Sequence, residues 1–181
     1  MLRPVFISLV LLLAPLAHAS VEQAGSAEAL VAGAAQELAV VGEDQVADTV
    51  LQTLDVPAIA RFTLGRHGRS LDDASKTRFT EAFEAYLRRQ IVSHASEFSG
   101  VQMSVTKISQ RNARDAVVTT LIERPGDRVT LRWRVIERGG KWSVVDLEFA
   151  GIWLAIEQRA QVSAILDRPG ATIETVIAQF E

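Results

Sequence analysis

The spacing of apolar residues changes near Gly100. Before this glycine, apolar side chains recur at steps of three and four residues, which is the repeat of an amphipathic helix. After it, apolar and polar residues alternate, as they do in a strand with one buried face. The clearest helical stripe consists of Phe79, Phe83, Tyr86, Leu87, Ile91 and His94. The chain is therefore expected to place helices before a sheet.

Two further helices are predicted before this stripe. Residues 28–51 are rich in Ala, Val, Leu and Glu, and are expected to form a helix that is interrupted near Gly42. The tripeptide Asp55-Val56-Pro57 opens a short helix over residues 58–64, because proline is tolerated in the first helical turn. The segment 70–73 (SLDD) resembles a capping box, in which the Ser70 hydroxyl would accept a hydrogen bond from the first free amides of the stripe helix.

Four strands are expected after Gly100, at residues 101–108, 113–123, 128–137 and 141–149. Turn residues at 125–127 (PGD) and at Gly139-Gly140 separate the last three strands, which are therefore expected to pair as antiparallel neighbours. Two more helices follow the sheet, over residues 153–166 and 172–180. This order of helices, antiparallel meander and helices indicates an α+β fold.

The third and last predicted strands divide their side chains by chemistry. The apolar sides carry Val129, Leu131, Trp133, Val135, Val145, Leu147 and Phe149. The polar sides carry Arg128, Thr130, Arg132, Arg134, Arg138, Asp146 and Glu148. We expect N- and C-terminal helices, with the stripe helix among them, to cover the apolar face. The other face is expected to reach water, with Arg132 or Arg134 paired to Asp146 or Glu148. Periodicity leaves open whether helices and sheet pack solidly or enclose a hydrophobic pocket.

Composition excludes several classes of function. The 181 residues carry a formal net charge of −3 and no cysteine, so disulfides, thiolate metal sites and thiol nucleophiles are absent. The slightly acidic balance argues against a dedicated nucleic-acid-binding protein. His67 and His94 have no second ligand at metal-binding spacing, and no nucleophile elbow, phosphate loop or dinucleotide fingerprint occurs. No metal, cofactor or enzymatic activity is therefore expected.

The first 19 residues have the features of a secretory signal peptide. Arg3 provides the positive charge, an apolar run covers residues 5–16, and Ala17-His18-Ala19 is a small-x-small cleavage site. The apolar run is shorter than the roughly 20 residues that a bilayer-spanning helix needs. We therefore expect cleavage after Ala19, export to the periplasm, and one mature domain over residues 20–181.

Three segments together resemble a known family. They are residues 58–67 (AIARFTLGRH), the Phe/Tyr stripe from Phe79 to Leu87, and residues 142–151 (WSVVDLEFAG). They resemble the MlaC family (toluene-tolerance auxiliary proteins), which are periplasmic phospholipid-binding proteins. The resemblance runs from about Asp48 to Phe180.

This resemblance implies a lipid carrier. Such a protein shuttles phospholipid between an outer-membrane lipoprotein complex and an inner-membrane ABC transporter, and holds the acyl chains in a hydrophobic pocket between helices and sheet. The expected lipid-binding residues are Ile59, Phe62, Phe83, Tyr86, Leu87, Val118, Leu131, Trp133, Val135, Leu147, Phe149 and Trp153.

Three alternatives remain open from the sequence. Trp153 stands where the family commonly has small hydroxyl-bearing residues, so it would narrow the entrance or shorten the cavity, and a polycyclic, hopanoid-type lipid is an alternative ligand. A periplasmic interaction module without a ligand is the second alternative. The third is an enzyme on a cone-shaped α+β scaffold with Asp146 as a buried base, although the strand pattern turns Asp146 to the solvated face.

Overall fold

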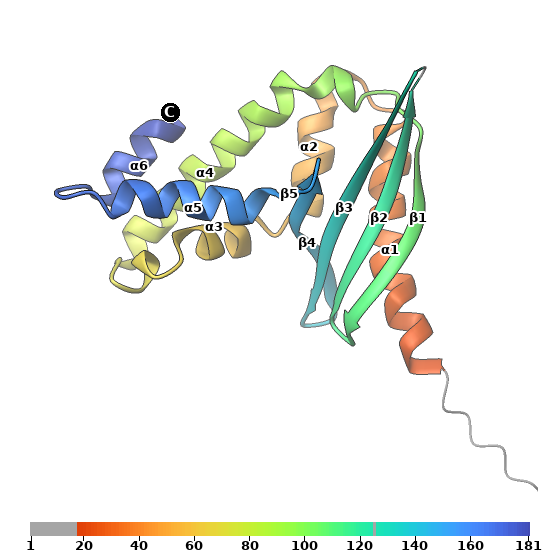
Figure 1. Ribbon diagram of the computed structural model, residues 1–181, viewed down its shortest axis with the longest axis horizontal. Coiled ribbons are helices and arrows are strands. Elements are labelled where there is room, and N and C mark those ends of the chain that lie inside the picture. Colours follow the sequence, from red (N-terminus) through yellow and green to blue (C-terminus); the bar gives the residue numbers. More distant parts are fainter. Residues whose placement is uncertain (1–17, 125) are drawn as a thin grey trace, which may run out of the picture.

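The computed structural model describes residues 18–124 and 126–181, and it joins a group of helices to one antiparallel sheet (Figure 1). The helices are α1 (His18–Leu38), α2 (Glu43–Thr53), α3 (Val56–Leu64), α4 (Asp73–Ser93), α5 (Leu154–Leu166) and α6 (Ile173–Phe180). The strands are β1 (Met103–Asn112), β2 (Asp115–Arg124), β3 (Asp127–Arg138), β4 (Lys141–Phe149) and β5 (Ile152–Trp153), in the order β1-β2-β3-β4-β5. The α+β prediction is confirmed, and the short β5 adds a fifth strand to the four expected.

The predicted signal peptide, residues 1–19, lies almost entirely outside the described residues and stays a prediction. None of the helices in residues 18–124 and 126–181 combines the length and apolar content of a bilayer-spanning segment.

Two aspartates begin the helices that follow α2. Asp55 caps α3, and its carboxylate accepts a hydrogen bond from the Ala58 amide at 3.0 Å. Asp72 caps α4 in the same way through the Ser75 amide at 2.7 Å, and this bond lowers the pKa of Asp72. The prediction of Ser70 as the cap is wrong, because a short 3-10 turn precedes α4 and the Ser70 hydroxyl donates to the His67 carbonyl instead.

The helices α2 to α6 contribute to a first core, which we call the helical cluster. Its buried members are Leu51, Val56, Ile59, Ala60, Leu64, Phe79, Phe83, Ala155, Val162, Ile165, Ile173, Val176, Ile177 and Phe180. The aromatic rings of α4 meet the ring of Phe180 from α6, with centroids 4.9 to 5.7 Å apart. Such tilted and offset pairs are the favoured arrangement of aromatic side chains. The aromatic part of the α4 stripe is therefore buried partly by α6.

The apolar face of the sheet belongs to a second core, which we call the sheet cluster. Its buried members are Ala27, Val31, Ala116, Val118, Ile122, Leu131, Trp133, Val135 and Val144. The N-terminal helix α1 supplies Ala27 and Val31, and it runs along the sheet in Figure 1. An N-terminal cover was expected, but the stripe helix α4 and the C-terminal α6 face other helices rather than the sheet. The reason is that the aromatic side chains of α4 and α6 bury one another.

A β-bulge changes the face of one valine on β4. Strands β3 and β4 pair Arg134 with Asp146 and then Val135 with Val144, so Val145 is the extra residue. Val144 is consequently fully buried in the sheet cluster, and Val145 is only half-buried. The expectation that Val145 points to the apolar face is wrong, because simple alternation does not anticipate the bulge.

Ion pairs neutralise the arginine row on the other face of the sheet. The pairs are Arg128–Glu123, Arg132–Glu148, Arg134–Asp115 and Arg138–Asp55, at 2.6 to 3.2 Å. The predicted pairing of Arg132 with Glu148 is confirmed. Because each of these guanidinium groups already has an acidic partner, the row does not present the unpaired charge that binding an anion requires.

Candidate functional site

Strand β4 attaches the helical cluster to the sheet at two places. At the first, Leu54 forms a parallel bridge with Val144, and the Asp55 amide donates to the Val144 carbonyl at 2.9 Å. The Asp55 carboxylate also accepts a hydrogen bond from Arg138 at 2.8 Å. Leu54 itself packs against both the helical cluster and the sheet cluster. The two cores therefore meet at the connection between α2 and α3.

The second attachment is made by Asp146. Its carboxylate accepts hydrogen bonds from the amides of Leu147 and of Ala155, which lies in the first turn of α5, both at 2.8 Å. The side chain is only 7% exposed, and burial raises the pKa of Asp146 even though both amides and Arg134 favour the charged form. The expectation of a solvated Asp146 is wrong, because β5 and α5 fold back over this end of the charged face. The geometry makes it a helix-anchoring group.

Replacing Asp146 by alanine is expected to lower the free energy of unfolding by about 1–3 kcal/mol, since the buried amide of Ala155 and the part-buried amide of Leu147 lose their acceptor. Asp146→Asn is the matched control because its amide oxygen accepts the same two hydrogen bonds. Urea unfolding followed by circular dichroism measures both variants. Equal stabilities for the alanine and asparagine variants would contradict the anchoring role.

The difference in stability between the wild-type protein and Asp146→Asn is expected to change with pH in one direction. Because the pKa of Asp146 is raised above its ordinary value of 3.8, the native protein binds this proton more tightly than the unfolded chain does. The contribution of Asp146 to stability is therefore complete below this value and is lost as the pH rises through the folded pKa. The stability of Asp146→Asn relative to the wild-type protein is expected to increase over that pH range. A difference that is constant with pH would argue against a raised pKa.

The twelve predicted lipid-binding residues lie in three places. The helical cluster holds Ile59 and Phe83, with Tyr86 and Leu87 packed against it. The sheet cluster holds Val118, Leu131, Trp133 and Val135, with Leu147 packed against it. Phe62 and Phe149 are exposed, at 37% and 47%, and Trp153 is partly buried, at the edges of α3, β4 and β5. That these residues bind lipid remains a prediction, and the structure divides most of them between two packed cores.

Arginine side chains lie against two of the three edge residues. The Arg132 guanidinium is 5.3 Å from the centre of the Trp153 ring, and that of Arg159 is 5.0 Å from the centre of the Phe62 ring. At these distances the cation is attracted to the face of the ring. Arg132 is also paired with Glu148, at 2.6 Å. The edge at Phe62 thus combines an apolar ring with a positive charge, whereas at Trp153 the charge of Arg132 is offset by Glu148.

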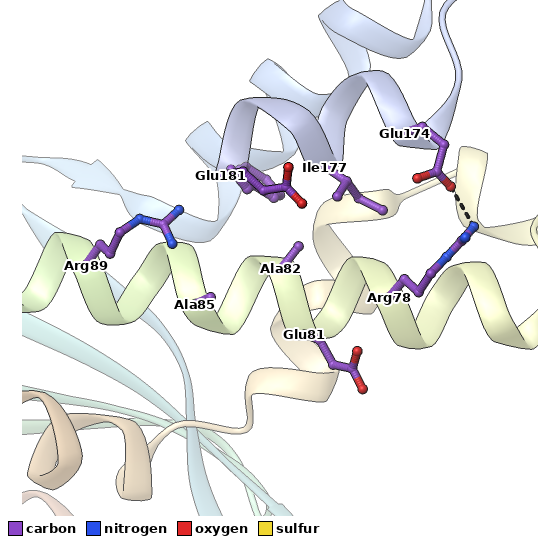
Figure 2. Close-up of a pocket in the computed structure, with 9 residues that line it drawn as sticks. Arg78, Glu81, Ala82, Ala85, Arg89, Glu174, Ile177 and Glu181 are labelled. Carbon is purple, nitrogen blue, oxygen red and sulfur yellow. Dashed lines mark hydrogen bonds and ion pairs between the residues drawn. The ribbon is translucent and has the colours of Figure 1, made fainter.

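Two surface grooves flank α6. The first lies between α4 and α6, has a volume of about 360 Å³, and is lined by Arg78, Glu81, Ala82, Ala85, Arg89, Glu174, Ile177, Phe180 and Glu181 (Figure 2). The Arg78–Glu174 ion pair, at 2.5 Å, crosses one end of this groove. The second groove, about 330 Å³, lies between α5 and α6 and includes Tyr86, Gln158 and Phe180. Both volumes are near the lower limit for small-molecule sites. Of the predicted residues, Tyr86 borders this second groove, where its hydroxyl accepts from Gln158 at 3.3 Å.

The residues that hold the two cores together were not predicted from the sequence. Leu54 is a single apolar residue between two helices, so no periodic pattern includes it. Its neighbour Asp55 has the sequence features of a helix cap, but nothing in the sequence indicates its bond to Arg138. Phe180 is not among the predicted lipid-binding residues, although it continues the apolar spacing of Ile173, Val176 and Ile177. That spacing was the available signal. Within the described part of the chain, no group of three or more histidine and acidic side chains is arranged to hold a metal ion.

A family model provides the deciding comparison: the model of the MlaC protein matches residues 33–181. The chain belongs to the MlaC family. Among solved structures, the fold of this MlaC-family chain is similar to the phospholipid-binding protein of Ralstonia solanacearum, which was solved in complex with a phospholipid. The two are 17% identical, the match covers 90% of each chain, and the TM-score is 0.67. A comparison with curated proteins found no match. The family is one of lipid-binding transport proteins and not of enzymes.

Proposed function

We propose that this MlaC-family protein is a periplasmic carrier that binds phospholipid and moves it between an outer-membrane lipoprotein complex and an inner-membrane ABC transporter. The observation that carries the proposal is the family match over nearly all of the described chain. The similar fold of the Ralstonia protein, which holds a phospholipid, supports it. A carrier needs no reacting groups, and the only buried carboxylate among the described residues is occupied in anchoring α5.

The architecture offers a physical route for binding acyl chains. The helical and sheet clusters are two apolar cores that meet at Leu54 and are attached through β4. Opening along this seam would make the apolar side chains at its border accessible, and parting of the elements within each core would expose the predicted lipid-binding residues that these cores contain. Each methylene removed from water contributes about 0.8 kcal/mol, so two long acyl chains supply on the order of 20 kcal/mol before the costs of binding.

The direct test is lipid analysis of the exported protein. Protein purified from the periplasm of the expression host is expected to begin at Ser20 and to release phospholipid on solvent extraction, as identified by mass spectrometry. Delipidated protein is expected to regain lipid from phospholipid vesicles. Absence of lipid together with absence of uptake would reject the carrier function. Recovery of a polycyclic lipid in place of phospholipid would favour the hopanoid-type alternative that Trp153 suggested.

A further inference from the structure

Large exposed apolar side chains are concentrated at one place on the surface. In the described residues seven such side chains are exposed, and four of them fall within an eight-residue stretch of the chain. These four are Phe149, Ile152, Leu154 and Ile156, each 45% to 55% exposed, and we call them the apolar rim. Single exposed apolar residues are ordinary, whereas a contiguous group usually marks a binding surface. The rim therefore needs a physical explanation.

The local backbone holds the rim together. Phe149 and Ile152 are register partners across the β4–β5 turn, which places their side chains next to each other on one face of the hairpin. Ala150 and Gly151 form this turn with φ values of 50° and 83°, in the left-handed region. Leu154 then begins α5 directly after β5, and Ile156 lies in the same first turn. Because Leu154 and Ile156 are two residues apart, they point to different sides of α5, so the four rim side chains surround the junction of β5 with α5.

The rim borders both apolar cores. Ala155, between Leu154 and Ile156 in the chain, is buried in the helical cluster. Leu131, the register partner of Phe149 on β3, is buried in the sheet cluster. Figure 1 shows β5 between the start of α5 and strand β4, where the helices meet the sheet. A molecule that enters between the two cores at this end of the seam would pass over the rim.

Two arginines lie near the rim, and one of them, Arg132, is paired with Glu148. Arg132 lies over Trp153, the residue between Ile152 and Leu154. Arg159 follows Ile156 by three residues, so the two side chains are neighbours on α5. The Arg159 guanidinium contacts Phe62 and, within the part of the chain that the structure describes, takes part in no ion pair. An unpaired cation beside exposed apolar side chains matches a ligand that has a phosphate next to hydrocarbon chains.

We infer that the apolar rim is the portal through which the acyl chains of a phospholipid enter and leave this protein, with Arg159 contacting the phosphate. This inference rests on the proposed carrier function and assigns the place on the surface where the transfer occurs. The rim side chains cover the acyl chains while these pass from a membrane to the seam between the two cores. A carboxylate introduced at the rim would have to lose its water on each passage, which is costly.

The test compares rim variants with variants at equally exposed apolar positions elsewhere. Ile152→Glu and Ile156→Glu change the rim, and Val92→Glu on α4 and Val40→Glu after α1 are the controls, at 56% and 82% exposure. The assay follows a pyrene-labelled phosphatidylglycerol as the purified full-length mature protein transfers it between phosphatidylethanolamine–phosphatidylglycerol vesicles. We expect the rim variants to transfer at least about tenfold more slowly. The controls are expected to stay within about twofold of the wild-type rate. Circular dichroism checks that every variant is folded.

The proposed contact between Arg159 and the phosphate is tested separately. Arg159→Gln is expected to slow transfer by about threefold, while Arg89→Gln on α4 leaves the rate unchanged. An equal rate for both glutamine variants would overturn the phosphate contact. Wild-type rates in folded Ile152→Glu and Ile156→Glu proteins would overturn the portal, and would assign the rim to docking with another protein. Failure of the wild-type protein to bind or transfer any lipid is a different result, which would instead reject the carrier function.

Discussion

Phe83→Ala is expected to lower the free energy of unfolding by about 3–5 kcal/mol, because it leaves a cavity in the helical cluster. Phe83 is buried on α4, and the rings of Phe79, Tyr86 and Phe180 surround it with centroids 5.6 to 6.4 Å away. These neighbours come from two helices that also pack against other elements, so the space cannot close by a small local shift. The loss should appear as a lower urea midpoint by circular dichroism.

The matched control for Phe83 is on the same helix. Val92→Ala removes an exposed apolar side chain from the last turn of α4, and its effect is expected to stay within about 0.5 kcal/mol. Similar midpoints for the two variants would show that the aromatic cluster does not stabilise the fold. Because Phe83 is also a predicted lipid-binding residue, the amount of lipid recovered with a folded Phe83→Ala protein distinguishes the two roles. A normal lipid content would restrict Phe83 to packing.

Trp133→Ala is expected to cost a similar amount, about 3–5 kcal/mol, in the sheet cluster. The indole is buried under α1, and its Nε1–H donates a hydrogen bond to the Thr120 hydroxyl at 2.9 Å. Trp133→Phe keeps most of the apolar contact but leaves the buried Thr120 hydroxyl without this donor, which costs about 1–3 kcal/mol. Both substitutions are measured by denaturant unfolding.

A double-mutant cycle separates the hydrogen bond from the packing. In Trp133→Phe/Thr120→Val both polar partners are gone, so the double variant is expected to be more stable than Trp133→Phe alone. Additive effects of the two single substitutions would mean that the bond from indole to hydroxyl contributes nothing.

The secondary structure could be predicted because its signals are local. Gly139 and Gly140 adopt φ values of 61° and 82°, which favour glycine, and the predicted bounds of β4 are those observed. Asp55 and Pro57 likewise defined the start of α3 from neighbouring residues alone. The choice between Ser70 and Asp72 as a cap failed, because both are good N-cap residues and a preceding 3-10 turn decided between them.

The tertiary arrangement could not be predicted, since it depends on which apolar surfaces meet. The α4 stripe matches the sheet face and the other helices equally well in pattern, and in the structure its aromatic rings pack against Phe180 of α6. Asp146 shows the same limit. Strand alternation placed it correctly beside Arg134, but whether a later helix covers that face is not encoded in the strand.

For the candidate site, the sequence supplied the apolar residue types but not their grouping. Most of the predicted residues are interior, yet they belong to two cores that a single pattern of alternation cannot distinguish. The exposure of the rim residues Ile152, Leu154 and Ile156 could not be predicted, because it follows from the fold of the β4–β5 turn and not from the apolar character of these side chains.

The position of the two polar attachments on β4 has a mechanical consequence. Val144 and Asp146 are two residues apart, so Asp55 and the start of α5 are fixed to a very short length of one strand. Two attachment points this close together restrain the helices from sliding along β4 more than they restrain the helices from rotating about it. Even a few degrees of rotation would be magnified with distance, and α6, at the far end of the molecule in Figure 1, would travel farthest.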